Sequence, residues 1–186
     1  MFNQLVLVVS VCSLTVFAFP IPVEGEAKEF FEFFPAEVLT FLSSLSEQDT
    51  QLLDEMKTQL IGKSPDNALE LVRSKSPDLA NRMTTMRESL MAKINNFSEI
   101  PRNFAINAMN KMQGVDQSDR VATFKAALEI YDAGTKLPQE AKDEMFRAFP
   151  SAKAFFNSEK IKNFFEENKN NSPEEIASQL ARQMPF

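Results

Sequence analysis

The sequence predicts an all-α protein that forms a single domain. Apolar residues recur at intervals of three and four over long stretches, which is the spacing of one face of a helix. Serine followed by proline and an acidic residue occurs three times, a pattern typical of a helix start. No stretch alternates with a period of two for long enough to indicate a strand.

The predicted helix starts lie at residues 64–66, 76–78 and 172–175, where Ser-Pro is followed by an acid. The serine hydroxyl can accept a backbone N–H that has no partner within the helix, and proline fits the first helical position. The acidic residue meets the positive end of the helix dipole. Ser46 with Asp49 is a weaker form of the same pattern, whereas residues 172–175 complete a capping box.

Two segments show the helical spacing most clearly. In the first, the intervals are four, three, four, four and three, at Leu79, Met83, Met86, Leu90, Ile94 and Phe97. In the second, they are three, four and three, at Val121, Phe124, Leu128 and Tyr131. We predict about ten short helices, over residues 36–45, 47–62, 65–75, 77–97, 99–113, 117–133, 138–149, 151–156, 159–169 and 173–184. Three of these helices are expected to end at Gly62, Gly114 and Gly134.

The first eighteen residues are predicted to be a cleaved signal peptide. They carry no charged side chain, and the apolar run Leu5–Ala18 ends with Val16 and Ala18 at the two positions that a signal peptidase reads. The run is too short to span a bilayer, so an uncleaved anchor is the weaker alternative. We therefore expect the protein to be secreted and extracellular.

Cleavage after residue 18 leaves 186 − 18 = 168 residues, enough for one domain with a sizeable core. This helical domain, residues 19–186, is expected to begin with a loose arm over residues 19–27, which two prolines keep extended. Cys12, the single cysteine, lies in the predicted signal peptide, so no disulfide is expected to hold the domain together.

The composition excludes most kinds of catalytic and metal site. Without histidine and without cysteine in the predicted domain, neither a Ser-His-Asp nor a Cys-His nucleophile can form, and the usual zinc ligands are missing. Glycine is too sparse for a phosphate-binding loop, and Asp116–Asp119 lacks the pattern of a calcium loop. The net charge of −6 argues against nucleic acid as a partner. We predict no catalytic residue, no metal and no cofactor, and an enzyme that uses carboxylates alone is the third-ranked alternative.

Phenylalanine is the distinctive residue type. Sixteen of the 18 phenylalanines lie after residue 18, with clusters at 30–34, 155–156 and 164–165, and eight methionines follow Met1. Such residues can bound an internal void, although they can equally form a solid core. Because neighbours on a helix point about 100° apart, the rings at 30–34 cannot all face one partner. Some are expected to be exposed, where they can touch a membrane transiently or another subunit.

Four sequence blocks resemble the nematode fatty acid and retinol binding proteins. Phe41–Asp49, followed by two leucines, resembles the opening helix pair of that family. Asn67–Glu70, Lys75–Leu79 and Lys93-Ile94 then match, in order and approximate spacing, its acidic-helix, Lys-Ser-Pro-acid-Leu and Lys-Ile blocks. The resemblance covers residues 38–105. It implies a small secreted carrier, a bundle of short helices around an internal apolar cavity, that takes up fatty acids and retinol without catalysis.

Within that hypothesis, residues on the apolar faces of the longest central helices are the candidates that line the cavity. They are Met83, Met86, Leu90, Ile94, Phe104, Met109, Phe124, Leu128 and Tyr131. Four basic residues close to these faces are candidates for binding a fatty acid carboxylate at the cavity mouth, Lys93, Arg102, Arg120 and Lys125. Each of the four can alternatively be an ordinary surface charge.

Two further expectations concern the protein surface. Asn96 begins a glycosylation sequon, Asn-Phe-Ser, and a second sequon at 170–172 is weakened by the proline that follows. The acidic helix faces leave open an alternative function, a secreted helical antigen or interaction protein that binds a protein partner or a divalent metal. The sequence does not predict the preferred lipid, the number of pockets or the oligomeric state.

Overall fold

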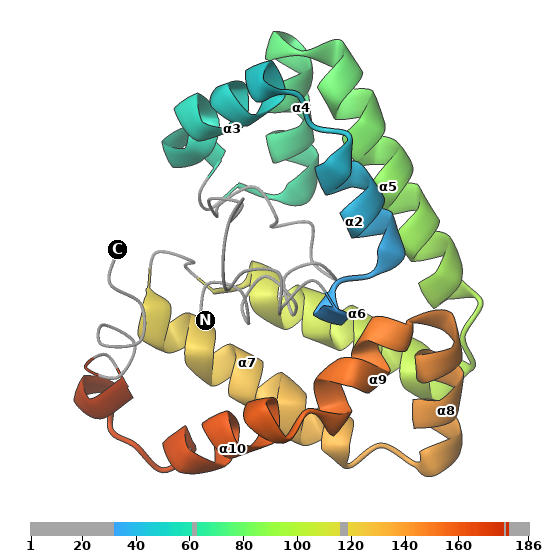
Figure 1. Ribbon diagram of the computed structural model, residues 1–186, viewed down its shortest axis with the longest axis vertical. Helices are drawn as coiled ribbons and strands as arrows, with labels where there is room; N and C mark the ends of the chain where they lie inside the picture. Colours follow the sequence, from blue (N-terminus) through green and yellow to red (C-terminus); the bar gives the residue numbers. More distant parts are fainter. Residues whose placement is uncertain (1–31, 61–62, 116–118, 177, 179–186) are drawn as a thin grey trace.

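The computed structural model describes residues 32–60, 63–115, 119–176 and 178, and these residues form helices and connecting turns without a strand (Figure 1). The helices are α2 (Ala36–Ser43), α3 (Glu47–Leu60), α4 (Pro65–Lys75), α5 (Pro77–Asn95), α6 (Glu99–Gln113), α7 (Arg120–Thr135), α8 (Gln139–Ala148), α9 (Pro150–Asn157) and α10 (Glu159–Asn168). The predicted all-α, single-domain fold is confirmed. The predicted signal peptide, the arm at 19–27 and Gly62 lie outside the described residues.

The predicted helix starts are confirmed by their hydrogen bonds. The side chain of Ser64 accepts the backbone N–H of Asn67 at 3.3 Å, and that of Ser76 accepts the N–H of Leu79 at 3.3 Å. In both helices proline occupies the first turn. The capping box at 172–175 also forms, with hydrogen bonds of 2.7 and 3.2 Å. These starts depend only on nearby residues, which is why the sequence pattern places them correctly.

The prediction for α7 was wrong at both ends. The helix begins at Arg120 because Asp119 accepts the N–H groups of Val121 and Ala122, at 3.0 and 2.9 Å. It continues through the predicted stop at Gly134 to Thr135. Gly134 is buried, and a Cβ there would overlap the ring of Phe156. This glycine therefore permits a close approach of two helices instead of ending one.

The ends of the other helices lie within two residues of the predicted positions wherever the structure describes them. Helix α6 has the predicted bounds and ends with Gly114 as its C-cap. Helices α2 and α5 each end two residues before the predicted position, and the predicted end of α3, residues 61–62, lies outside the described residues. Of the predicted helix at 173–184, residues 173–176 and 178 are described, and they are helical. None of the described helices is both long and apolar enough to cross a membrane.

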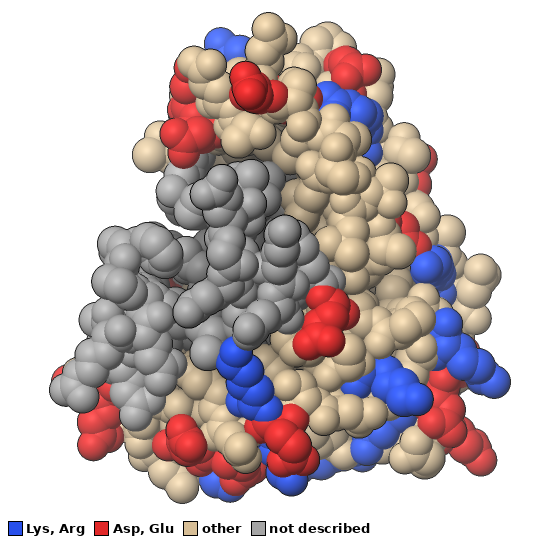
Figure 2. Space-filling model, viewed as in Figure 1, with Lys and Arg blue, Asp and Glu red and all other residues tan. Residues whose placement is uncertain are grey.

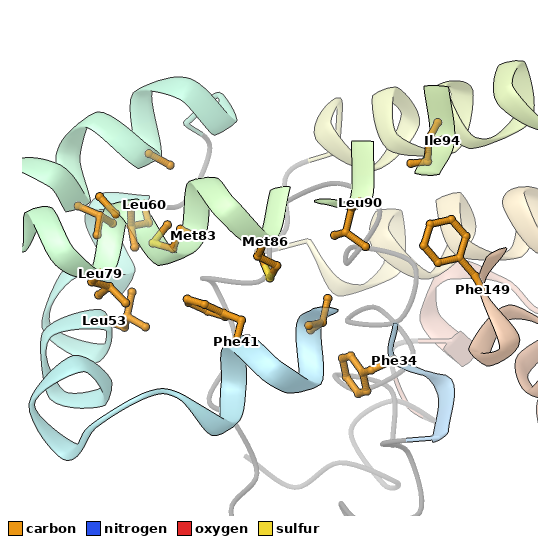
Figure 3. Packing of buried hydrophobic residues seen from close by; sticks show 14 of the residues in the cluster. Phe34, Phe41, Leu53, Leu60, Leu79, Met83, Met86, Leu90, Ile94 and Phe149 are labelled. Atoms are coloured by element: carbon orange, nitrogen blue, oxygen red, sulfur yellow. The ribbon is translucent and has the colours of Figure 1, made fainter. Parts of the chain in front are cut away.

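The helices enclose two groups of buried residues, which we call the first and second clusters. The first cluster joins α2, α3, α4 and α5, and it includes residues of α6 and α8. Figure 3 shows Met86 and Leu90 of the long helix α5 facing Phe41 and Phe34. Helix α4 packs along α5, and α2 lies beside the same helix (Figure 1). Helix α5 is thus the common support of this half of the molecule.

The second cluster is rich in aromatic rings and joins α6, α7, α9 and α10. Tyr131 stacks on Phe165 with ring centroids 4.6 Å apart, and Phe124 meets Phe164 edge to face at 5.6 Å. Burial raises the pKa of Tyr131. Phe33, just before α2, belongs to this cluster, whereas Phe34 belongs to the first. Both rings are buried, so the exposure expected within 30–34 does not occur at these two residues.

A network around Asp49 fixes the turn between α2 and α3 against α5. Asp49 accepts hydrogen bonds from the backbone N–H and hydroxyl of Ser46, at 2.9 and 2.8 Å, and from Arg82 at 2.8 Å. Arg82 also donates to the backbone oxygen of Ser44. Burial raises the pKa of Asp49, but the bonds from Arg82 and Ser46 outweigh it, so the pKa lies below its ordinary value.

Candidate functional site: an apolar pocket between two clusters

A pocket of about 90 Å³ lies where the first and second clusters meet. Five helices contribute to it, α5, α6, α7, α8 and α9, together with the segment before α2. Its wall consists of Phe33, Pro35, Leu90, Ile94, Phe97, Phe104, Ala105, Ala108, Ile130, Met145, Phe149, Ser151, Ala152, Phe155 and Phe156. We call it the central pocket.

Phenylalanine rings brace the wall of the central pocket. Phe33 meets Phe155 edge to face at 6.0 Å, and Phe97 meets Phe149 in the same way at 6.0 Å. Phe155 in turn packs edge to face against Phe156 at 5.4 Å. These contacts hold the rings against one another, so that the space between the helices does not collapse.

Alanine side chains leave room between the rings. Ala105 and Ala108 on α6 are buried, and Ala152 on α9 is half-buried. Each of these side chains ends at Cβ, so α6 and α9 leave the space of the pocket free at these positions. Among the wall residues that the structure describes, Ser151 carries the one hydroxyl group and no residue is charged, so the pocket favours an apolar ligand.

The volume limits what the pocket can hold in this conformation. A single water needs roughly 10–15 Å³ on the same measure, and apolar cavities of roughly 150 Å³ bind benzene. A pocket of about 90 Å³ therefore accepts only part of a long acyl chain. A whole chain requires side chains to move apart, and the flexible Met145 of α8 is the wall residue best suited to do so.

Three of the nine predicted lining residues come together on the central pocket. Leu90 and Ile94 reach it from α5, and Phe104 reaches it from α6. Leu90 and Ile94 are 5% and 2% exposed, so both are core residues as well as wall residues. Their contact with a ligand stays a prediction.

The other six predicted lining residues lie elsewhere. Met83 is buried in the first cluster, Met109 packs on the outside of that cluster, and Met86 lines a separate groove. Phe124 and Tyr131 are buried in the second cluster, against which Leu128 packs. Their helical spacing identified buried faces correctly, but periodicity alone does not separate a solid core from a pocket wall.

Lys93 lies next to the wall residue Ile94 and contacts α2 and the junction between α8 and α9. Its Nζ forms an ion pair with Glu37 of α2, donates a hydrogen bond to the backbone oxygen of Ala148 at 3.3 Å, and lies 5.3 Å from the ring centroid of Phe149. The lysine therefore ties α5 to α2 and to the end of α8. A fatty acid carboxylate that approaches Lys93 has to compete with Glu37.

The other three predicted carboxylate partners lie away from the central pocket or outside the described side chains. Arg102 is half-buried in the first turn of α6, and Lys125 is exposed on α7. Neither belongs to the pocket wall. The side chain of Arg120, at the start of α7, is outside the described part of the chain.

A second hollow, which we call the α2–α5 groove, has a volume of about 560 Å³. It is lined by Ala36, Glu37, Thr40, Phe41 and Ser44 of α2 and by Asn81, Arg82, Thr85, Met86 and Ser89 of α5. In Figure 2 the surface over α2 and the middle of α5 is mostly uncharged. The groove shares no lining residue with the central pocket.

The sequon at Asn96 lies at a helix junction. Asn96 is exposed and is the C-cap of α5, while Phe97 is buried in the first cluster. Ser98 donates from its hydroxyl and its backbone N–H to Glu144, at 2.6 and 2.7 Å, and these bonds lower the pKa of that carboxyl. Glycosylation of Asn96 stays a prediction. Among the residues that the structure describes, no three or more Asp and Glu side chains are grouped as metal ligands.

Comparison with known proteins assigns the chain to a family. Residues 28–167 match the family described as nematode fatty acid retinoid binding protein (Gp-FAR-1). The chain belongs to this family. The match extends well beyond the residues 38–105 that carry the sequence resemblance, and it includes every residue on the wall of the central pocket. The family predicted from the four sequence blocks is therefore confirmed.

Individual members of the family are similar at a modest level. The fatty-acid and retinol-binding protein 1 of Wuchereria bancrofti is 26% identical over 168 residues, which cover 87% of this chain and 94% of that protein. The protein of the same name from Caenorhabditis elegans is 25% identical over 174 residues, with 87% and 95% covered. No solved structure matches the chain. The family and its members are named for binding lipids and not for a catalysed reaction.

Proposed function

We propose that this protein is a secreted carrier that binds fatty acids and retinol non-covalently in the central pocket, without a catalytic step. The observation that carries the proposal is the apolar pocket at the meeting of the two clusters, in a chain of the fatty acid and retinoid binding family. The relatives named for fatty acid and retinol binding match along almost their whole length. Secretion rests on the signal peptide predicted for residues 1–18.

Burial of the acyl chain supplies the binding energy in this proposal. At about 0.8 kcal/mol per methylene, a chain of sixteen carbons contributes roughly 12 kcal/mol of gross transfer free energy. Part of it is offset by ordering of the ligand and by moving side chains to enlarge a pocket of about 90 Å³. The remainder is sufficient for useful affinity, and it needs no covalent chemistry.

In this proposal Lys93 is the partner of the polar end of a fatty acid. Lys93 lies beside the wall residues Ile94 and Phe149, and its side chain is partly exposed. A chain inserted between the two clusters with its carboxylate at the rim can share this cation with Glu37, or displace Glu37 from it. A basic side chain that runs along apolar surface to a pocket mouth suits this role.

Titration with a fluorescent fatty acid tests the proposal. We expect saturable binding, a blue shift of the probe emission, and displacement of the probe by unlabelled oleate and by retinol. The chain has no tryptophan and one tyrosine, so the protein contributes little background emission. Thermal stabilisation by calcium with no lipid-dependent change would contradict the proposal and favour binding of a metal by the acidic helix faces. Mass spectrometry of lipids extracted from natively purified protein identifies the cargo.

A further inference from the structure

Ser151 is the unusual residue on the wall of the central pocket. It is 9% exposed, and it carries a hydroxyl group in an otherwise apolar lining. Within the described part of the chain, its side chain forms no hydrogen bond. A buried hydroxyl without a partner is costly, because it has lost water and gained nothing in return. A ligand in the pocket that forms a hydrogen bond with this hydroxyl would remove the cost.

The start of α9 fixes the position of Ser151. Phe149 is the N-cap of this helix, proline occupies the first helical position, and Ser151 follows directly. The backbone N–H of Ala152 donates to the oxygen of Phe149 at 3.0 Å, and the ring of Phe149 packs edge to face against Phe97. The first turn of α9 contains no acidic residue, so the positive end of the helix dipole is free to favour a ligand oxygen.

The surroundings of Ser151 favour a neutral head group over a charged one. No residue on the described wall of the central pocket carries a charge. An ionised carboxylate beside Ser151 would lose its hydration without gaining a cation, which one hydrogen bond does not offset. A neutral hydroxyl loses much less hydration and recovers most of it in a single hydrogen bond. The interior of the pocket therefore suits an alcohol better than a carboxylate.

A carboxylate has a different partner at the same helix junction. Nζ of Lys93 donates to the backbone oxygen of Ala148, three residues before Ser151, but Lys93 does not belong to the pocket wall. Its side chain is 39% exposed, so a carboxylate bound there keeps part of its contact with water. The junction of α8 and α9 thus offers a partly exposed cation and, within the pocket, a buried neutral hydroxyl.

We propose that Ser151 is the specificity-determining residue that binds neutral lipid alcohols in the central pocket. The hydroxyl of the ligand forms a hydrogen bond with the hydroxyl of Ser151, and the apolar chain lies against the rings and alanines of the wall. The carboxylate of a fatty acid stays at Lys93. The inference rests on the proposed function for the pocket and its ligands, and it identifies the residue that distinguishes retinol from a fatty acid.

Retinol and its hydrocarbon analogue without the hydroxyl group test the inference, because they share the polyene and differ only in the head group. Their dissociation constants are measured by equilibrium dialysis and polyene absorbance for the wild type, Ser151→Ala and Ser74→Ala. Ser74 is exposed on α4 and lines neither hollow, so its replacement is the matched control. Relative to the analogue, Ser151→Ala should bind retinol about five- to tenfold more weakly than the wild type does, since one hydrogen bond is lost. Palmitate should displace the fluorescent fatty acid from Ser151→Ala as it does from the wild type.

Comparison of the two polyenes separates a lost hydrogen bond from a change in pocket shape, which would affect both alike. If Ser151→Ala leaves the ratio of the two dissociation constants unchanged, or weakens retinol, the analogue and palmitate equally, the inference is wrong while the proposed function stands. If the wild type binds neither retinol nor the fluorescent fatty acid, the proposed function itself fails. Should Ser151→Ala not fold, Ser151→Cys decides, because a thiol is close in size to a hydroxyl and only a weak donor. The same decrease in relative retinol affinity is expected, and an unchanged ratio would overturn the inference.

Discussion

Filling the central pocket should make the protein more stable and a poorer lipid binder at the same time. Ala108 is 7% exposed, lies on α6 and contributes to the pocket wall. The substitution Ala108→Leu adds three carbon atoms at a position that faces about 90 Å³ of free space. Leucine has nearly the helix propensity of alanine, so the helix itself is little affected.

The size of the effect follows from the pocket volume. Cavities in protein cores cost about 24 cal/mol per Å³, so complete filling of about 90 Å³ would raise the free energy of unfolding by about 2 kcal/mol. The three added carbons, at about 0.8 kcal/mol each, give a similar ceiling. Imperfect fit against the surrounding rings reduces the gain, so we expect about 1 kcal/mol, or a rise in melting temperature of about 2–4 °C.

Urea unfolding followed by circular dichroism measures the stability, and the fluorescent fatty acid titration measures binding. We expect Ala108→Leu to weaken fatty acid binding at least tenfold, because the leucine occupies the space where the chain enters. Ala92→Leu is the matched control, since Ala92 is exposed on α5 and should leave both quantities nearly unchanged. Destabilisation of more than about 1 kcal/mol by Ala108→Leu, or unchanged lipid affinity, would refute the assignment of the pocket.

Three other predictions concern single positions. The pKa of Asp49 lies below its ordinary value, so its contribution to stability is present above the unfolded-state pKa of about 3.9 and is lost as pH falls through the folded-state pKa. Wild-type protein should therefore lose stability more steeply below about pH 4 than Asp49→Asn, and parallel urea curves would contradict this. Gly134→Ala should lower the melting temperature, because the collision with Phe156 exceeds a helix-propensity gain of about 1 kcal/mol. Asn96→Gln should remove a glycan mass from protein secreted by eukaryotic cells, and an unchanged mass would contradict modification at Asn96.

The helix starts were predictable from the sequence because they depend on local chemistry. Ser64 and Ser76 cap their helices through residues three positions away, and proline in the first turn reinforces the start. Helix ends were less predictable. Glycine is common where helices end, which is why Gly134 was predicted to end one. In the structure Gly134 lies against the ring of Phe156 in α9, more than twenty residues later in the chain, where a Cβ would not fit.

The candidate site was only partly predictable, for the same reason. Lys93 was predicted as a carboxylate partner because it lies next to an apolar face, and in the structure its ammonium group lies near the ring of the wall residue Phe149. Its contact with a ligand stays a prediction. Its acidic partner, Glu37, precedes it by more than fifty residues, and no periodicity connects the two. Ala105 and Ala108 were missed because alanine is an ordinary helix residue, and it indicates free space only once the facing helices are known.

From composition alone, rings and methionines could together bound a void or form a solid core, and in the structure the two residue types have different roles. Six phenylalanines lie on the wall of the central pocket, whereas Met145 is the single methionine there. Met83, Met112 and others fill the solid parts of the two clusters, which suits a side chain that adapts to irregular gaps. A flat ring cannot follow such gaps, and rings that brace one another edge to face leave space between them. The pocket therefore lies where stiff aromatic rings from both clusters face short alanines, and the adaptable methionines keep the rest of the core filled.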